Sequence, residues 1–199
     1  MHSLPRASCI ILSAGESLRM MQHKALLKFD AGTTFIHKIT ETYYLSGIEQ
    51  LIVVLNEELY DLVINLAPSL PQKVQFVVNL YPERGRFFSL QTGLQLLNNG
   101  NYCFFQNIDN PFTSAAMLET LYSHRDDAEV LIPAFGNKQG HPVLLSPKVV
   151  QKICTTTNPG LRIDDFLRQF RQQRIETPDS RILTNINLPE DYRNAGFPY

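Results

Sequence analysis

The chain has 199 residues, of which 44% are hydrophobic and 19% are charged, values that are ordinary for a folded globular protein. Its formal net charge is −1, so bulk electrostatics favour neither nucleic acid nor a membrane surface as a partner, and any phosphate site must be local. The first residues lack a signal-peptide apolar region, and no apolar run reaches membrane-spanning length. We therefore expect a cytoplasmic protein that folds as one domain over residues 1–199.

Short apolar runs alternate with helical patterns along most of the chain. The runs are almost continuously apolar, which is typical of strands buried on both faces of a parallel sheet. The predicted strands span residues 7–12, 50–55, 74–78, 102–106, 128–132 and 182–186. The predicted helices span residues 34–45, 57–66, 89–97, 114–122, 148–153 and 163–171. This alternation predicts an α/β fold with a doubly wound, mostly parallel sheet flanked by helices.

Polar residues close the first four predicted strands. A loop with Gly15 follows the first strand, and Asn56, Asn79 and Asp109 follow the next three. Because the carboxyl ends of parallel strands meet at one edge of a sheet, and ligands bind beyond that edge, these residues are expected to form a single site. The alternative for each asparagine is a residue that only forms a turn.

The loop after the first strand is predicted to hold a nucleoside triphosphate. Its small residues let a polyphosphate approach the backbone N–H groups, and Arg19 and Lys24 supply two cations. Asp109 ends an apolar strand and can hold Mg²⁺, a hard cation that prefers oxygen ligands. The alternatives are solvated surface charges for Arg19 and Lys24 and a turn-forming aspartate at position 109.

Five segments, in order, resemble nucleotidyltransferases that act on the molybdenum cofactor. They are Leu12-Ser13-Ala14-Gly15-x-Ser17-x-Arg19-Met20-x-x-x-Lys24, then Asn79 with Gly85 and Ser89-Leu90-x-x-Gly93-Leu94, then Asp109-x-Pro111, then Gly140-His141-Pro142-Val143-Leu144, and finally Asn185-Ile186-Asn187-Leu188-Pro189-Glu190-Asp191. Together they cover nearly the whole chain. The resemblance implies a Rossmann-like nucleotidyltransferase fold.

The resemblance also implies an activity and assigns residues to it. The activity is Mg²⁺-dependent transfer of a nucleoside monophosphate from an NTP to a phosphorylated small-molecule acceptor such as molybdopterin, with release of pyrophosphate. A molybdoenzyme or its chaperone is a further partner that such an activity allows. The implied catalytic residues are Arg19, Lys24 and Asp109, the metal ligands are Asp109, Asn185 and Asn187, and the acceptor contact is His141. The implied nucleotide-binding residues are Leu12, Ser13, Ala14, Gly15, Arg19, Lys24, Asn79, Gly85 and Ser89, and Asn56 is predicted to join them from its place at the end of the second strand.

The base and the acceptor stay open at this point. The segments 13–15 and 140–142 favour CTP, whereas the asparagines at 185 and 187 favour GTP; CTP is the preferred prediction. One alternative is transfer to a sugar phosphate or another small phosphate. Another is a nucleotide-binding accessory protein with weak turnover, which is suggested by Met21 in place of a glycine and by the uncharged Asn185 and Asn187. A serine at 89 can also serve only as a helix cap, and a lone histidine such as His141 is more often a packed residue.

Overall fold

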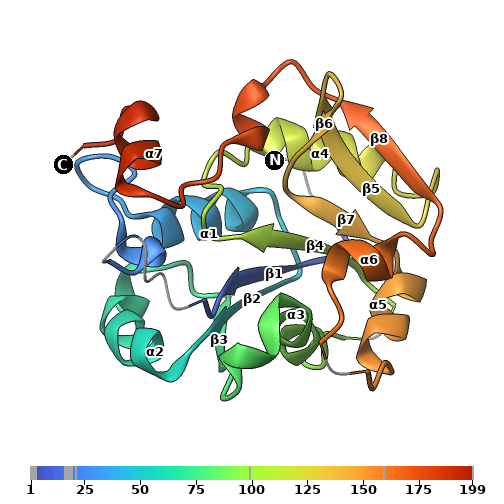
Figure 1. The fold of residues 1–199 in the computed structure, drawn as a ribbon, viewed down its shortest axis with the longest axis horizontal. Coiled ribbons are helices and arrows are strands. Elements are labelled where there is room, and N and C mark those ends of the chain that lie inside the picture. The colour runs from blue at the N-terminus through green and yellow to red at the C-terminus, as the bar shows by residue number, and fades with distance from the viewer. Residues whose placement is uncertain (1–3, 16–19, 21, 99, 159, 199) are drawn as a thin grey trace.

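The computed structural model describes residues 4–15, 20, 22–98, 100–158 and 160–198. These residues form an eight-stranded sheet with helices on both faces (Figure 1). The strands are β1 (Ala7–Ser13), β2 (Gln50–Leu55), β3 (Val74–Val78), β4 (Tyr102–Asn107), β5 (Val130–Phe135), β6 (Lys138–Gln139), β7 (Val143–Leu145) and β8 (Gln172–Glu176). The α-helices are α1 (Phe35–Leu45), α2 (Glu57–Val63), α3 (Gly85–Leu94), α4 (Ala115–Ser123), α5 (Pro147–Cys154), α6 (Ile163–Leu167) and α7 (Pro189–Asn194). Short 3-10 helices span Lys24–Leu26, Ile64–Ser69, Pro82–Arg84 and Ser180–Leu183.

The first half of the sheet is parallel. Its strands lie in the order β3-β2-β1-β4, and each neighbouring pair is parallel. All seven residues of β1 are buried, as a strand covered by helices on both faces must be. The predicted α/β fold is therefore confirmed, and the carboxyl ends of these four strands lie along one edge.

The second half of the sheet is mixed. β7 lies between β4 and β5 and is antiparallel to both, while β8 runs parallel to β5. Val143 at the start of β7 pairs with Phe105 near the end of β4. The residues that precede β7 therefore lie at the same edge as the residues that follow β4.

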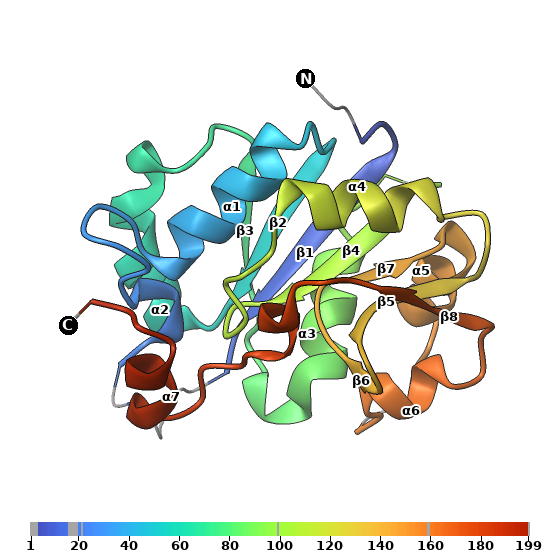
Figure 2. The same cartoon turned by 90° about the horizontal axis from the view of Figure 1, so that it is seen from above.

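Two hydrophobic layers cover the faces of the sheet. Cys9 and Ile11 of β1 pack into the layer that includes α1 and α4, whereas Ile10 and Leu12 pack into the layer that includes α3, α5 and α6. This alternation is the two-residue period of a strand. Figure 2 shows α1 and α4 on one side of the strands and α3 on the other. Among the described residues, none of the helices combines the length and the apolar character that a membrane span requires.

Two predictions about the last third of the chain are wrong. Residues 182–186 form no strand: Ile182 is buried within a 3-10 helix that ends at Leu183, and Ile186 is buried in the loop that follows. The predicted helix 163–171 stops at Leu167 and is followed by β8, which was not predicted. Ile175 is the one apolar residue of β8, so that strand depends on pairing with β5 and not on its own pattern.

The bounds of β5 and α3 differ from those expected in ways that have a clear physical reason. β5 runs through Pro133 to Phe135. Pro133 is tolerated because it lies between the residues of β5 that pair with β7 and those that pair with β6. α3 begins at Gly85, with a φ of 82°, four residues before the predicted start, so Ser89 lies inside the helix and is not its cap.

Candidate active site at the carboxyl edge of the sheet

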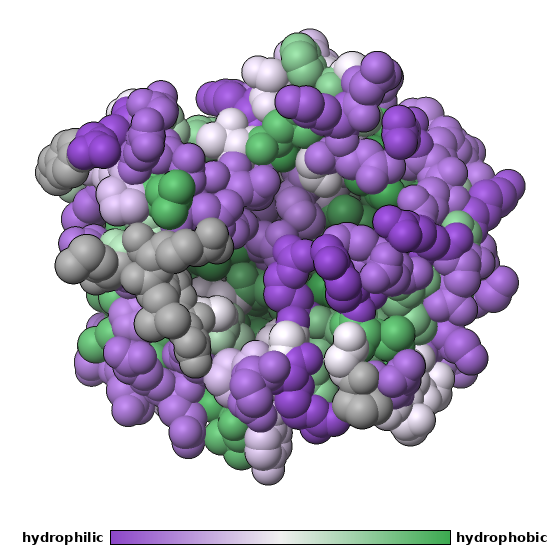
Figure 3. Space-filling model, in the orientation of Figure 1, coloured by the Kyte–Doolittle hydropathy of each residue, from purple (hydrophilic) through white to green (hydrophobic). Residues whose placement is uncertain are grey.

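Three predicted site residues meet at the carboxyl edge of the sheet. The Nζ of Lys24 donates to the Oδ1 of Asn187 at 2.7 Å and to the Oδ2 of Asp109 at 3.2 Å. The side chains of Lys24 and Asp109 are only 13% and 22% exposed, so solvent screens this ion pair less than a surface pair. We call Lys24, Asp109 and Asn187 the edge cluster. Figure 3 shows the surface of the molecule in the orientation of Figure 1, with a hollow near the middle of the view.

Backbone hydrogen bonds hold Asn187 in the edge cluster. The N–H of Ile186 donates to the carbonyl of Asp109 at 2.8 Å. The carboxylate of Asp191 accepts from the N–H groups of Asn187 and Leu188, both at 2.8 Å. Asp191 is the third residue of α7, which starts at Pro189, and a carboxylate there is a typical partner for free N–H groups at a helix start. Hydrogen bonds made by the residues on each side of Asn187, and by its own N–H, therefore fix its position.

The edge cluster fits a hard divalent cation. The Oδ1 of Asp109 is buried and has no hydrogen-bond partner among the described residues. A carboxylate and an amide oxygen suit Mg²⁺, which is usually bound by one or two carboxylates together with substrate phosphates. No group of three His, Cys, Asp or Glu side chains in the described part of the chain can hold a metal. The edge cluster thus offers one charged ligand, and phosphate oxygens would have to supply the rest.

Asn185 does not join the edge cluster. Its side chain is exposed, and its amide donates to the carbonyl of Leu183 at 3.4 Å. No hydrogen bond links it to Lys24, Asp109 or Asn187. Its role as a metal ligand therefore stays a prediction, with weaker geometric support than that of Asn187.

The predicted phosphate loop is described only in part. Ser13 and Ala14 are buried and Gly15 is exposed, while Arg19 lies outside the described residues, as do Ser17 and Met21. The carbonyl of Leu12 accepts from the N–H of Ile108 at 3.1 Å, and its side chain packs in the core. Any part that Leu12 plays at the site is therefore one for its backbone.

The other predicted nucleotide-binding residues are engaged in internal hydrogen bonds. Asn56 caps α2 by accepting from the N–H of Leu59 at 2.8 Å. Asn79 donates to the hydroxyl of Ser89 at 2.9 Å and accepts from the N–H of Tyr81. This bond ties the end of β3 to α3, which starts at the exposed Gly85. The three polar side chains shape the edge, and their contact with a nucleotide stays a prediction.

His141 lies at the same edge, against the end of β4. Its Nε2 is 2.9 Å from the Nδ2 of Asn107, and its ring packs edge-on against Phe105. Because an amide N–H only donates, this assignment makes Nε2 the acceptor and leaves the ring proton on Nδ1. Burial lowers the pKa of His141 to about 4, opposed by the negative charge of Asp109. The imidazole is therefore neutral at pH 7.

Asn107 was not predicted as a site residue. It is the last residue of β4, and its partner His141 follows a chain reversal that local sequence does not reveal. The signal that was available is its place at the end of a buried strand, two residues before Asp109.

Gly140 brings the segment before β7 against the segment that leads to Asn187. A Cβ at position 140 would lie 2.5 Å from the carbonyl oxygen of Ile182, so only glycine fits there. The N–H of His141 and the amide of Asn110 both donate to that carbonyl, at 3.3 and 2.7 Å. The two segments therefore enter the edge as one unit.

Comparison with known proteins decides the family. The model of the MobA-like NTP transferase domain matches residues 9–175, which contain Lys24, Asp109 and His141. The chain belongs to the MobA-like NTP transferase domain family. The description of this family and the edge cluster both indicate nucleotidyl transfer as the class of reaction.

Named relatives of this MobA-like chain include both cytidylyl- and guanylyltransferases. The chain is 25% identical to the molybdenum cofactor cytidylyltransferase of Escherichia coli K12, over 94% of each chain. It is 26% identical to a probable molybdenum cofactor guanylyltransferase of Rhodopirellula baltica, over 92% of this chain and 88% of that one. A solved nucleotidyl transferase from Methanothermobacter has the same fold, with a TM-score of 0.79, 21% identity and 95% coverage of both chains.

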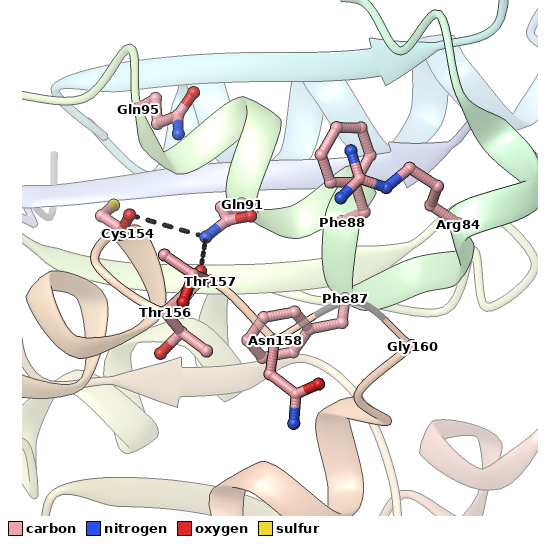
Figure 4. Close-up of a pocket in the computed structure, with 10 residues that line it drawn as sticks. All are labelled: Arg84, Phe87, Phe88, Gln91, Gln95, Cys154, Thr156, Thr157, Asn158 and Gly160. Carbon is pink, nitrogen blue, oxygen red and sulfur yellow. Dashed lines mark hydrogen bonds between the residues drawn. The ribbon is translucent and has the colours of Figure 1, made fainter.

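A cavity of about 310 Å³ lies beside α3 in this MobA-like domain (Figure 4). The guanidinium of Arg84 lies 4.0 Å from the ring centre of Phe88, and Gln91 donates to the carbonyls of Ile153 and Thr156. The lining residues are Arg84, Phe87, Phe88, Gln91, Gln95, Cys154, Thr156, Thr157, Asn158 and Gly160. No predicted site residue lines it, so the cavity is not the site that the sequence indicates.

Proposed function

We propose that this protein transfers a nucleoside monophosphate from an NTP to the phosphate of molybdopterin, with CTP as the preferred nucleotide. The observation that supports this most is the edge cluster, in which a lysine from the phosphate loop, a carboxylate after β4 and an amide before α7 share hydrogen bonds. The family supports the class of reaction, and the E. coli relative is a molybdenum cofactor cytidylyltransferase.

In the proposed reaction, an acceptor phosphate oxygen attacks the α-phosphorus of the NTP, the bond to the β-phosphate oxygen breaks, and pyrophosphate leaves. Lys24 and Arg19 neutralise the triphosphate, and the backbone around Gly15 approaches it. Asp109 and Asn187 are the residues that would hold Mg²⁺. A bound divalent cation supplies charge neutralisation at the phosphate oxygens.

His141 has a defined part in this proposal. Burial lowers the pKa of its imidazole to about 4, so at pH 7 the ring carries no positive charge and is too weak a base to be suited to taking a proton from the acceptor. Its ring is fixed by Asn107 and Phe105. We propose that His141 lines the acceptor site and hydrogen-bonds to the acceptor. It does not serve as the general base.

The test is pyrophosphate release, measured for each of the four NTPs with Mg²⁺, with and without molybdopterin. The expected result is release with CTP and molybdopterin, lower release with GTP and none without acceptor. Absence of release in every combination, from protein shown to be folded, would contradict the proposal.

Two other functions are distinguished by this assay together with a measurement of NTP binding. Release with a sugar phosphate in place of molybdopterin would identify a different acceptor. An accessory role is favoured by one observation, namely that Asp109 is the one charged ligand of the edge cluster. It predicts NTP binding by calorimetry without pyrophosphate release.

A further inference from the structure

The edge cluster already contains a cation. The ammonium of Lys24 hydrogen-bonds to the Oδ1 of Asn187 at 2.7 Å, which a metal would use, and to the Oδ2 of Asp109 at 3.2 Å, the second oxygen of the carboxylate whose Oδ1 has no partner among the described residues. The side chain of Lys24 is 13% exposed, so its ammonium is held within the edge cluster and is not a solvated surface charge. A divalent cation bound to the same oxygens would face a like charge within a few ångströms.

We infer that Lys24 competes with the divalent cation for Asp109 and Asn187, and that the triphosphate relieves this competition by drawing the ammonium away. The inference rests on the proposed function, because it takes the triphosphate as the ligand of the loop before Lys24. It assigns Lys24 two successive positions, one on the protein oxygens and one on phosphate.

The charges of the described residues support this order of events. Asp109 supplies one negative charge, and Asn187 supplies an oxygen without charge. Lys24 cancels the charge of Asp109, so the edge cluster as a whole attracts a free divalent cation weakly. A triphosphate brings several negative charges, which offer the ammonium new acceptors and the metal new ligands.

The lysine side chain suits such a movement. It is a flexible four-carbon stem with three rotatable donors, unlike the rigid fork of arginine. Lys24 begins a 3-10 helix of three residues, Lys24–Leu26, directly after the phosphate loop. The neighbouring Ala25 is fully buried, so the backbone is anchored while the ammonium can exchange partners.

A purely structural role for Lys24 makes a different prediction. In that case the ammonium holds the segment around Asn187 in place, and its removal loosens the edge cluster and weakens metal binding. Competition predicts the opposite, because removal of the ammonium frees two oxygen ligands and restores the negative charge of Asp109. The sign of the change in metal affinity therefore separates the two roles.

The experiment is a titration with Mn²⁺, followed by the electron paramagnetic resonance signal of the free ion, in the absence of nucleotide. The proteins are the wild type, Lys24→Met and the control Lys28→Met. Both substitutions remove one positive charge. Lys28 is exposed and makes no side-chain bond to the edge cluster, so its variant controls for the change in net charge alone. We expect Lys24→Met to bind Mn²⁺ at least about fivefold more tightly than the wild type, the lower end of the usual coupling between two ligands, and Lys28→Met to match the wild type. Equal or weaker binding by Lys24→Met, or equal tightening by Lys28→Met, would overturn the inference.

A second measurement needs no variant and covers the case in which Lys24→Met does not fold. The Mn²⁺ affinity of the wild type is measured with and without α,β-methylene-CTP, which cannot release pyrophosphate. We expect the analogue to raise it at least about fivefold, and the metal to raise the affinity for the analogue by the same factor. An unchanged Mn²⁺ affinity, with the analogue shown to bind, would contradict the inference. Failure of the proposed function is seen separately, as absence of pyrophosphate release, because neither titration involves turnover.

Discussion

The ammonium of Lys24 donates to the Oδ1 of Asn187 at 2.7 Å, although the two residues are 163 positions apart in the chain. This bond joins the loop after the first strand to the segment before the last helix, and both contact Asp109. The chemistry proposed for the edge cluster therefore depends on three separate segments, each of which can be tested by a substitution.

Asp109→Asn should nearly abolish nucleotidyl transfer. The change removes the one charged ligand of the edge cluster and keeps the size of the side chain, so we expect a loss in kcat of about 100-fold or more with little change in thermal stability. Pyrophosphate release measures the effect. The control is Asp61→Asn on the exposed side of α2, which should retain full activity. Similar losses for both variants would point to a general effect of charge and would contradict the assignment.

Asp191→Ala tests how Asn187 is positioned. The substitution removes the acceptor for the N–H groups of Asn187 and Leu188, so it should destabilise the fold by about 1 kcal/mol, as loss of a helix-start partner usually does. It should also lower kcat/KM, because Asn187 is no longer fixed beside Asp109. The neighbouring Glu190→Ala, which removes an exposed carboxylate from the same helix turn, is the matched control. Loss of stability without loss of kcat/KM would show that Asp191 acts only on the helix.

Gly140→Ala should destabilise the protein. The new Cβ would lie 2.5 Å from the carbonyl oxygen of Ile182, and relief of that overlap requires a backbone shift that costs about 1–3 kcal/mol. Denaturant unfolding gives the free energy of unfolding. Gly32→Ala is the control, since its Cβ would lie 3.8 Å from the nearest atom, the Oδ1 of Asp30. Equal stabilities for the two variants would contradict the close approach.

His141 should make stability depend on pH. Burial lowers the pKa of its imidazole from 6.5 to about 4, so above about pH 6.5 the folded and unfolded chains both hold it neutral and it has no effect. As the pH falls from 6.5 to 4, the unfolded chain takes up a proton that the folded chain does not, and stability falls by up to about 3 kcal/mol. Unfolding measured without metal over this range, for the wild type and His141→Asn, should show a smaller fall in the variant. Parallel curves would contradict the assignment of this effect to His141.

The parallel half of the fold could be predicted because each strand is a short apolar run that is buried on both faces. Residues 50–55 and 74–78 form strands with the predicted bounds. β8 could not be predicted in this way, since Gln172–Glu176 contains one apolar residue and is a strand only because β5 offers it an edge. Conversely, Ile182 is buried within a 3-10 helix and Ile186 within a loop, so their apolar character does not reflect a strand.

Lys24, Asp109 and Asn187 were predicted as site residues from the resembling segments, and Asp109 also from its place after a predicted strand. Asn107 was not, because its partner His141 approaches through the antiparallel β7, and the alternation of strands and helices does not predict that reversal. The placement of Asn185 outside the edge cluster also depends on tertiary structure, since it and Asn187 are equivalent in the sequence pattern. That residues 1–199 form a single domain stays a prediction.

The position of Asn187 has a consequence for synthesis of the protein. The eight strands of the described residues all precede it in the chain, so synthesis from the N-terminus delivers every one of them before Asn187. Phe197 then packs against Phe29, Phe35 and Phe112, which draws the last segment onto the body of the protein. A chain that stops before residue 187 therefore contains these eight strands but lacks both the amide that completes the edge cluster and the aromatic residues that hold the last segment in place.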